Sequence, residues 1–278
     1  MMDIFYVNHV GECIDLNSEN IILQYQELFN YSWDARVKNG KIAAFRRDSA
    51  TIPITVAVTA ETEAEYLQMI EDFYSITEKD ILAVMPGKLW MNGQYLNCFI
   101  SGDIKQDAFK GIPYQIKNLT IVTDYPFWIK ETSYQYLPEN PISGSDSILT
   151  AGVMFPEFPF DFSPVKGDKV LENPSFTESN FILTIYGFAE SPQITIAGHP
   201  YRVECTVYEG ERLVIDSLAR TVQKIGRLGE ITNLYNARDK FYSVFKKMPP
   251  GMNTFQWSGG FGVDITLFDE RSEPKWSF

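Results

Sequence analysis

Paired acidic residues are the part of this sequence most able to do chemistry. The candidate pairs are Asp264 with Asp269, and Glu209 with Glu211. Two carboxylates on either side of a cleft are what glycoside hydrolysis requires. In a chain with 36 acidic residues, however, such pairs also arise by chance. Asp264 shares a strand face with Thr266, opposite the apolar neighbours, and this alternation favours a solvent or interface position over a catalytic one.

Histidine and cysteine give no further catalytic signature. The only histidines, His9 and His199, are not at metal-ligand spacing, and "AGHPYRV" places His199 in a turn before a strand. The sequence has no G-x-S-x-G elbow. Cys13, Cys98 and Cys205 lie far apart, so neither a disulfide framework nor a zinc site is expected. We predict that they are buried as small apolar side chains.

Two further features could bind ligands. The glycine-rich "SGGFG" (258–262) runs into a strand instead of opening a helix, so it predicts a turn or bulge and not a phosphate-binding loop. Trp257 and Tyr208 are candidate stacking platforms for a sugar. The preferred interpretation for both side chains is a position in the core or in an interface.

The charge balance excludes some partners. The formal net charge is −12 and the pI is about 4.7. Basic residues cluster only in pairs, such as Arg46-Arg47, so sequence-specific nucleic-acid binding is not expected. No stretch approaches the roughly 18 apolar residues of a membrane span, so no membrane insertion is expected. The first residues do not resemble a signal peptide, which predicts a protein made and kept in a cytoplasm.

The elements that would position these residues are mostly strands. "TIPITVAV" (51–58) alternates with period two, and Pro53 suggests an edge position. Thr62 with Glu65 forms a capping box that predicts a helix from Thr62 to Ile76. Its expected core stripe is Leu67, Ile70, Phe73 and Tyr74. Asn39-Gly40 and Asn92-Gly93 predict two tight hairpins.

The predicted organisation is a mainly β chain with one helix. Residues 1–134 form a β-rich domain containing that helix, and 135–172 form an extended Pro- and Phe-rich connector. Residues 173–278 contain short strands separated by turn signals, a pattern typical of a β-sandwich. The last strand is expected to bury Phe261, Val263, Ile265 and Leu267. The charged cluster 269–273 should end this strand and protect a sheet edge, and Trp276 should anchor the tail.

Long stretches of the chain resemble the distal tail proteins of long-tailed, siphovirus-type phages. In the second half these are "FILTIYGFAESPQITIAGHPYRVECTVYEGERLVIDS" and "NLYNARDKFYSVFKKMPPGMNTFQWSGGFGVDITLFDERSEPKW". The most specific parts are "LTIYG…ITI", "GxNxFxW" and "ERSEPKW". In the first half, the hairpin–strand–helix order and "IVTDYPFWIKE" carry the resemblance.

The resemblance implies a structural virion protein, a baseplate hub located at the tail tip and assembled in the cytoplasm of a bacterial host. It implies a homohexameric ring formed by the N-terminal domain and a galectin-like C-terminal β-sandwich. The expected neighbours are the major tail tube protein, a tail-associated fibre or spike protein and a receptor-binding protein. The family has no catalytic residues to carry over and no known cofactor requirement, so the chain is not expected to be an enzyme.

Charged residues are candidates for contacts between subunits of such a ring. They are Arg46, Arg47, Arg271 and Glu273. Solvated surface charge is the alternative for each of them. At the level of function, the alternative to a hub is a carbohydrate-binding adhesin that acts through the C-terminal sandwich.

Overall fold

The structure is a computed structural model that describes residues 3–106, 111–139 and 169–276. Its contacts divide the chain into two units. The first unit contains Met1–Lys130 together with Glu270–Phe278, and the second contains Glu131–Asp269. The sequence-based division placed all of 173–278 in one domain, whereas the contacts assign the last residues to the first unit. Of the expected connector, 140–168 lie outside the described residues.

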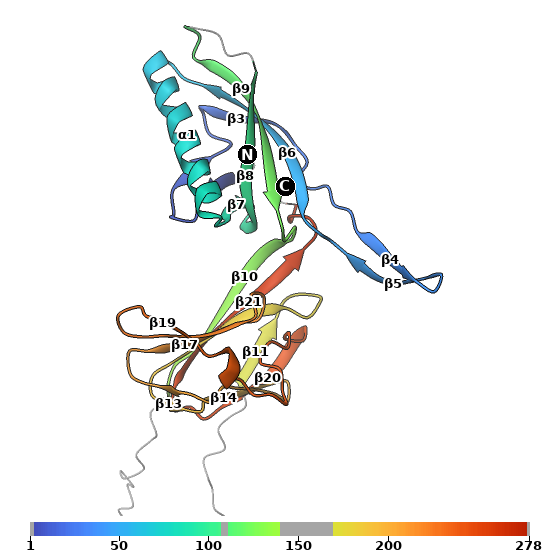
Figure 1. Ribbon diagram of the computed structural model, residues 1–278, viewed down its shortest axis with the longest axis vertical. Helices are drawn as coiled ribbons and strands as arrows, with labels where there is room; N and C mark the ends of the chain where they lie inside the picture. Colours follow the sequence, from blue (N-terminus) through green and yellow to red (C-terminus); the bar gives the residue numbers. More distant parts are fainter. Residues whose placement is uncertain (1–2, 107–110, 140–168, 277–278) are drawn as a thin grey trace, which may run out of the picture. The chain divides into compact units, whose positions relative to one another are not determined.

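The first unit contains an antiparallel sheet with strand order β3-β6-β9-β8-β7-β1-β2 (Figure 1). The strands are β1 (Ile4–Val7), β2 (Cys13–Asp15), β3 (Ile21–Gln26), β6 (Ala50–Thr59), β7 (Gly87–Met91), β8 (Gln94–Gln106) and β9 (Tyr114–Thr123). The predicted burial of β6 is confirmed, since Ile54, Val56 and Val58 are at most 1% exposed. Pro53 is exposed where β6 extends past β3 and pairs with β9 alone, so its missing N–H costs no ladder bond to β3.

The helix is α1 (Glu63–Ala83), the only α-helix of the described residues. The predicted cap is confirmed, because Thr62 Oγ1 accepts a hydrogen bond from Glu65 N at 3.2 Å. The helix continues well past the predicted end at Ile76. The expected core stripe is only partly right: Phe73 is buried, but Leu67 and Tyr74 are 58% and 55% exposed. Apolar residues occur on two faces of α1, and periodicity does not decide which face meets the sheet.

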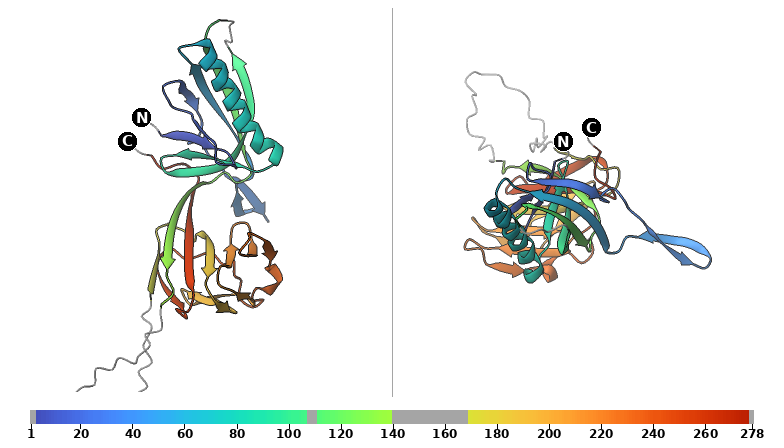
Figure 2. Two further views of the ribbon diagram at one scale, coloured as in Figure 1. Left: turned by 90° about the vertical axis from the view of Figure 1, so that its left-hand side faces the viewer. Right: turned by 90° about the horizontal axis from the view of Figure 1, so that it is seen from above.

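Both predicted hairpins are confirmed. Asn39-Gly40, with φ of 53° and 73°, joins β4 (Asp34–Lys38) to β5 (Lys41–Arg46). Asn92-Gly93, with φ of 52° and 74°, joins β7 to β8. Strands β4 and β5 pair only with each other, and they extend away from the sheet of the first unit as a two-stranded arm (Figures 1 and 2).

The second unit is a β-sandwich, as predicted. One sheet has the order β19-β18-β17-β12-β21-β10, the other β11-β20-β14-β15, and β13 pairs with β16. The elements are β10 (Trp128–Tyr136), β11 (Lys169–Asn173), β12 (Asn180–Tyr186), β13 (Ala189–Glu190), β14 (Gln193–Ile196), β15 (His199–Arg202), β16 (Thr206–Val207), β17 (Arg212–Asp216), β18 (Thr221–Ile225), β19 (Ile231–Asn233), a 3-10 turn η1 (Tyr235–Ala237), β20 (Gly251–Trp257) and β21 (Gly262–Arg271). Strands β10 and β21 carry the chain from the first unit into the second and back.

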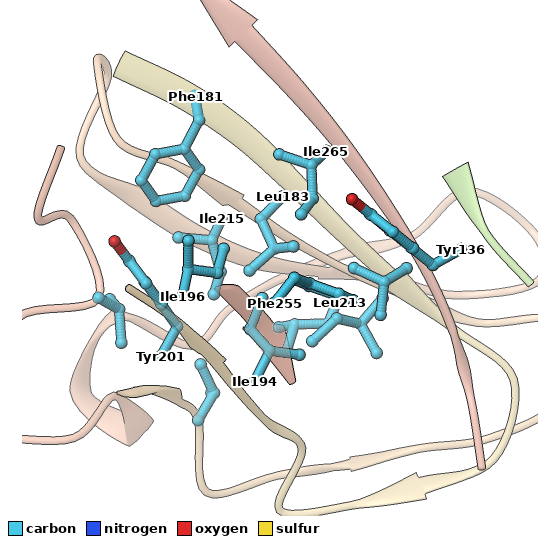
Figure 3. Packing of buried hydrophobic residues seen from close by; sticks show 14 of the residues in the cluster. Tyr136, Phe181, Leu183, Ile194, Ile196, Tyr201, Leu213, Ile215, Phe255 and Ile265 are labelled. Atoms are coloured by element: carbon cyan, nitrogen blue, oxygen red, sulfur yellow. The ribbon is translucent and has the colours of Figure 1, made fainter. Parts of the chain in front are cut away.

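The core of the second unit is filled from both of its sheets. Leu183 and Ile265 come from one sheet, and Ile194 and Phe255 come from the other (Figure 3). The predicted buried face of β21 is confirmed: Phe261, Val263, Ile265 and Leu267 are all at most 5% exposed.

The charged cluster 269–273 contains the end of β21, as predicted, but this strand is not an edge strand of its sheet. Strand β21 continues through Asp269 and Glu270 to Arg271, and in the sheet order it lies between β12 and β10. It is therefore an inner strand over Gly262–Phe268, where it pairs with β12, and its last three residues extend past that pairing. Asp269 is only 6% exposed. Alternation within one strand cannot show how many neighbours the strand has, so the position of β21 in the sheet was not predictable from its own residues.

Candidate functional site

The paired acids of β21 do not form a glycosidase-like pair. Asp264 and Asp269 are five residues apart on one strand, which separates their Cα atoms by about 16 Å. This exceeds the roughly 5–9.5 Å that separates the carboxyl groups of glycosidases. Asp264 is half-buried and accepts a hydrogen bond from Tyr186 Oη at 3.3 Å, whereas Asp269 is buried.

The second acidic pair is held by two backbone N–H groups and one lysine. Glu209 Oε1 accepts a bond from Phe188 N at 3.3 Å. Glu211 Oε2 accepts a bond from Tyr208 N at 3.0 Å and pairs with Lys224 Nζ at 3.1 Å. The backbone bond, followed by the bond to Lys224, lowers the pKa of Glu211. A carboxyl group with a lowered pKa is a poor general acid at neutral pH.

The structure brings acids of both pairs to the edge of one hollow in the second unit, a combination that is not predicted from the sequence. The hollow has a volume of about 790 Å³. Its polar lining consists of Asp264, Glu209, Glu211, Arg212, Arg227, Thr184 and Tyr186. Five glycines also line it: Gly187, Gly210, Gly226, Gly229 and Gly260.

The ring of Tyr186 lies over the backbone of Gly262 beside this hollow. A Cβ added to Gly262 would come within 2.2 Å of the Tyr186 ring, so only glycine allows the ring to lie there. The Asp and Glu carboxylates and the two arginines can accept and donate hydrogen bonds to the hydroxyl groups of a sugar. The aromatic ring of Tyr186 adds an apolar surface, as in many ligand sites. Gly262, the first residue of β21, therefore provides the space that the Tyr186 ring occupies beside the hollow.

The two predicted sugar platforms lie in different aromatic groups. Trp257 Nε1 donates to Phe261 O at 3.0 Å, and its ring packs 5.0 Å from Phe255 and 5.7 Å from Tyr136, measured between ring centroids. Tyr208 is 54% exposed. Neither residue is among those that line the hollow. Trp257 thus occupies the packing position that was preferred for it, while Tyr208 is accessible.

A pair formed by the buried Asp80 and the half-buried His9 in the first unit has the residue types of a catalytic site. Asp80 is fully buried, and its Oδ1 lies 2.5 Å from His9 Nδ1 and accepts a bond from His9 N at 2.9 Å. Its Oδ2 accepts a bond from Tyr6 Oη. Burial raises the pKa of Tyr6, and it raises the pKa of Cys98 to about 12, so both groups are protonated at neutral pH.

These groups connect the C-terminal end of α1 to the strands β1 and β8. Neither a thiolate nor a phenolate is available at neutral pH, and the pair therefore has no activated nucleophile beside it. His199 has a similar structural setting, with Nε2 2.9 Å from Ser243 O and its ring packed on Tyr201 and Tyr242. The prediction that all three cysteines are buried is wrong for Cys13, which is exposed, whereas Cys205 is half-buried.

The candidate inter-subunit residues have different environments. Arg46 is exposed on β5. The Arg47 guanidinium lies 5.0–5.8 Å from the ring centres of Tyr31, Trp33 and Phe127, and burial lowers its pKa. Its Nη1 donates to Ser272 O at 3.3 Å. Arg47 is thus engaged within its own chain, while Arg271 and Glu273 are half-buried.

Two negative findings apply to the part of the chain that the structure describes. Within residues 3–106, 111–139 and 169–276, no group of three or more His, Cys, Asp or Glu side chains is placed to hold a metal ion. Over the same residues, no helix has the length and apolarity needed to cross a bilayer.

The fold defines a class. A sheet backed by one helix, followed by a β-sandwich, is the architecture that this chain shares with chains of solved phage structures. The structure of SPP1 Dit, described as a paradigm of the hub adsorption apparatus in phages that infect Gram-positive bacteria, matches with a TM-score of 0.59 at 10% identity. The match covers 97% of this chain and 99% of SPP1 Dit.

Two structures of the phage p2 baseplate in its activated conformation, with Sr and with Ca, match in the same way. The structure with Sr has a TM-score of 0.61, and the match covers 99% of this chain and 100% of the p2 chain. The structure with Ca has a TM-score of 0.58, and the match covers 98% of this chain and 99% of the p2 chain. Both are 12% identical to this chain. The predicted resemblance to phage distal tail proteins is confirmed for the fold. No family model and no curated protein matches the sequence.

Proposed function

We propose that this chain is a structural, non-enzymatic subunit of a phage baseplate. It forms a homohexameric ring at the tail tip and joins the major tail tube protein to the tail-associated fibre or spike and to the receptor-binding protein. Its sandwich is galectin-like, and the ring assembles in the cytoplasm of a bacterial host before becoming part of the virion.

The observation that carries this proposal is the extent of the structural match. Both units match in one continuous comparison that covers 97–99% of this chain and at least 99% of each neighbour. A shared sandwich alone would say little, because that fold serves many functions. A two-unit architecture matched from end to end is a more specific feature.

The exposed arm supports the assembly part of the proposal. Every residue of β4 and β5 is exposed, including the apolar Val37, Ile42 and Phe45. An isolated two-stranded hairpin is at best marginally stable in water. A partner that covers this apolar surface would stabilise the arm, and a neighbouring subunit of a ring is such a partner.

Light scattering after gel filtration tests the ring. We expect a mass of six subunits for the protein alone or after mixing with its tail tube and fibre neighbours, and closed rings in negative-stain images. Contacts with the neighbouring tail proteins would add to the contacts between subunits, so the protein is tested under both conditions. A monomer under both conditions would overturn the proposal.

The hollow of the second unit favours one other function, that of a carbohydrate-binding adhesin. Tyr186 would support a sugar ring, and Asp264 would accept hydrogen bonds from its hydroxyl groups. Titration with the host's cell-wall polysaccharide tests this function. We expect binding that Asp264→Asn weakens at least about tenfold, whereas Glu172→Gln on the other sheet leaves it unchanged. Absence of binding to any envelope glycan would remove this candidate without affecting the hub.

A further inference from the structure

The arm has one apolar face and one basic face. The register pairs Ala35 with Phe45 and Val37 with Ile42, so these apolar side chains share a face. A register shift between Arg36 and Val37 keeps Ile42 and Phe45 on that face although they are three residues apart. On the other face, the charged residues are Asp34, Arg36, Lys38, Lys41 and Arg46. Four basic residues against one acid make the arm strongly positive in a chain of net charge −12.

Helix α1 has the opposite character on the side away from the sheet. A single stripe at helical spacing contains Glu63, Leu67, Glu71, Tyr74, Glu78, Ile81 and Leu82. Its apolar members are well exposed: Leu67 is 58%, Tyr74 55% and Leu82 78% exposed. Within the helix, Lys79 is the only basic residue, and it is paired with Glu12 at 2.6 Å.

These two surfaces are complementary in charge and in chemistry. Each combines exposed aliphatic and aromatic side chains with a net charge, which is positive on the arm in spite of Asp34 and negative on the helix stripe. Exposed apolar groups of this kind mark interaction sites when they are grouped together. All residues of the arm are exposed, so the arm does not cover the α1 stripe of its own chain.

We propose that the arm of one copy docks on the α1 stripe of the next copy. This inference rests on the proposed ring, and it names the two surfaces that would form the ring's contact. One copy offers its arm to one neighbour and its helix to the other, which is the heterologous contact that closes into a ring. The apolar residues of the two surfaces cover each other, and the long Arg and Lys side chains reach around the narrow ribbon to the glutamates.

The opposite charges orient the encounter of two acidic subunits that would otherwise repel each other. Electrostatic complementarity of this kind mainly raises the association rate and selects the partner surface. Salt weakens it, since the Debye length falls to about 3 Å at 1 M ionic strength. Assembly that is driven in this way should therefore be slower at high salt.

A charge-swap experiment tests the pairing. The arm variant carries Arg36→Glu, Lys38→Glu and Lys41→Glu, and the helix variant carries Glu63→Lys, Glu71→Lys and Glu78→Lys. Each variant alone places like charges in every contact, so we expect subunit association to weaken at least about tenfold. An equal mixture of the two variants can alternate around an even-numbered ring with opposite charges in every contact. We expect this mixture to recover rings of wild-type mass.

The controls separate misfolding and failure of the ring from failure of the pairing. Far-UV circular dichroism and thermal unfolding confirm that each variant is folded. Glu19→Lys with Glu172→Lys and Glu178→Lys makes the same three charge reversals as the helix variant, but on other exposed residues, and should leave assembly unchanged. If the wild type assembles and both variants assemble equally well, the arm–helix contact is overturned but the ring is not. The same holds if the wild type assembles but mixing the two variants does not restore rings. A wild type that never assembles, even with its tail neighbours, would overturn the ring itself.

Discussion

The contacts of Trp257 determine how a substitution at this residue can be interpreted. Its indole donates to Phe261 O and packs between Phe255, Tyr136 and the ammonium group of Lys169. Trp257→Ala would therefore leave a cavity at the edge of the core, and lost binding in this variant would not identify a sugar platform.

We predict that Trp257→Ala lowers the free energy of unfolding by about 3 kcal/mol. Tyr208→Ala, at the other candidate platform, should change it by less than about 0.5 kcal/mol because Tyr208 is largely exposed. Urea unfolding followed by far-UV circular dichroism measures both changes. Equal effects of the two substitutions would contradict the packing role of Trp257.

Lys117 is a residue whose positive charge is destabilised by burial in the folded protein. Its side chain is 1% exposed, its Nζ is 2.6 Å from Asp103 Oδ2, and it lies 4.7 Å from the ring centre of Phe73. Burial lowers its pKa below the ordinary 10.5, although the bond to Asp103 opposes that shift. Between the lowered pKa and 10.5, the unfolded chain binds more protons at this site than the folded chain, so stability attributable to Lys117 rises with pH.

The pH dependence of Lys117→Met tests this sign. We expect the wild type to gain stability relative to Lys117→Met as the pH rises from 8 towards 10.5, the ordinary lysine pKa. Tyrosines with raised pKa values contribute equally to both proteins, so the difference isolates Lys117. Lys105→Met removes a more exposed lysine from the same carboxylate, and because Lys105 makes only the smallest contribution to the lowered pKa of Lys117, it should change the pH slope much less than Lys117→Met does. A difference that is constant or falls with pH would refute the assignment.

Among the elements, the arm differs most from the strands around it. Its strands β4 and β5 have exposed side chains on both faces, whereas β6 buries Ile54, Val56 and Val58. Elements with few buried contacts open locally at low free energy.

Hydrogen exchange can follow the arm before and after assembly. In the dissociated protein, we predict that the amides of β4 and β5 exchange at least about tenfold faster than those of β6. Assembly should slow the exchange of the arm and leave β6 unchanged. The arm would not be a docking element if it exchanged as slowly as β6 in the monomer, or equally fast in the ring.

At the scale of the whole molecule, the end of the chain stabilises its beginning. Glu270 Oε1 accepts a bond from Tyr125 Oη at 2.8 Å, and Lys275 N donates to Gln94 Oε1 at 2.6 Å. Trp276 stacks on Phe29 with ring centroids 4.1 Å apart, which confirms its predicted anchoring role. These contacts join residues that are about 145 to 250 positions apart in sequence, and all of them lie within the first unit.

Deleting residues 272–278 should therefore destabilise the first unit and not the second. Losing one stacked indole and its neighbouring hydrogen bonds is expected to cost about 2 kcal/mol. Hydrogen exchange resolved by segment would show faster exchange in β7 and β8, with β12 as the internal reference. If β12 were affected more than β7 and β8, the assignment of the tail to the first unit would be wrong.

The sequence by itself determined the local features. Asn39-Gly40 and Asn92-Gly93 specified two hairpins because the turn needs positive φ at both positions. Thr62 specified the start of α1, and the alternation of Val263, Ile265 and Leu267 specified the buried face of β21. The resemblance carried by "GxNxFxW" and "ERSEPKW" led to a fold that the structural neighbours share. Each of these features depends on residues a few positions apart.

Only the tertiary structure decided which surfaces and residues come together. It selected Phe73 over Leu67 and Tyr74 for the core, and so left an acidic and apolar stripe on the exposed side of α1. It placed Asp264 with Glu209 and Glu211 around one hollow, and it returned the chain's last residues to the first unit. Sheet order and packing between distant strands determine these placements, and no local periodicity encodes either of them.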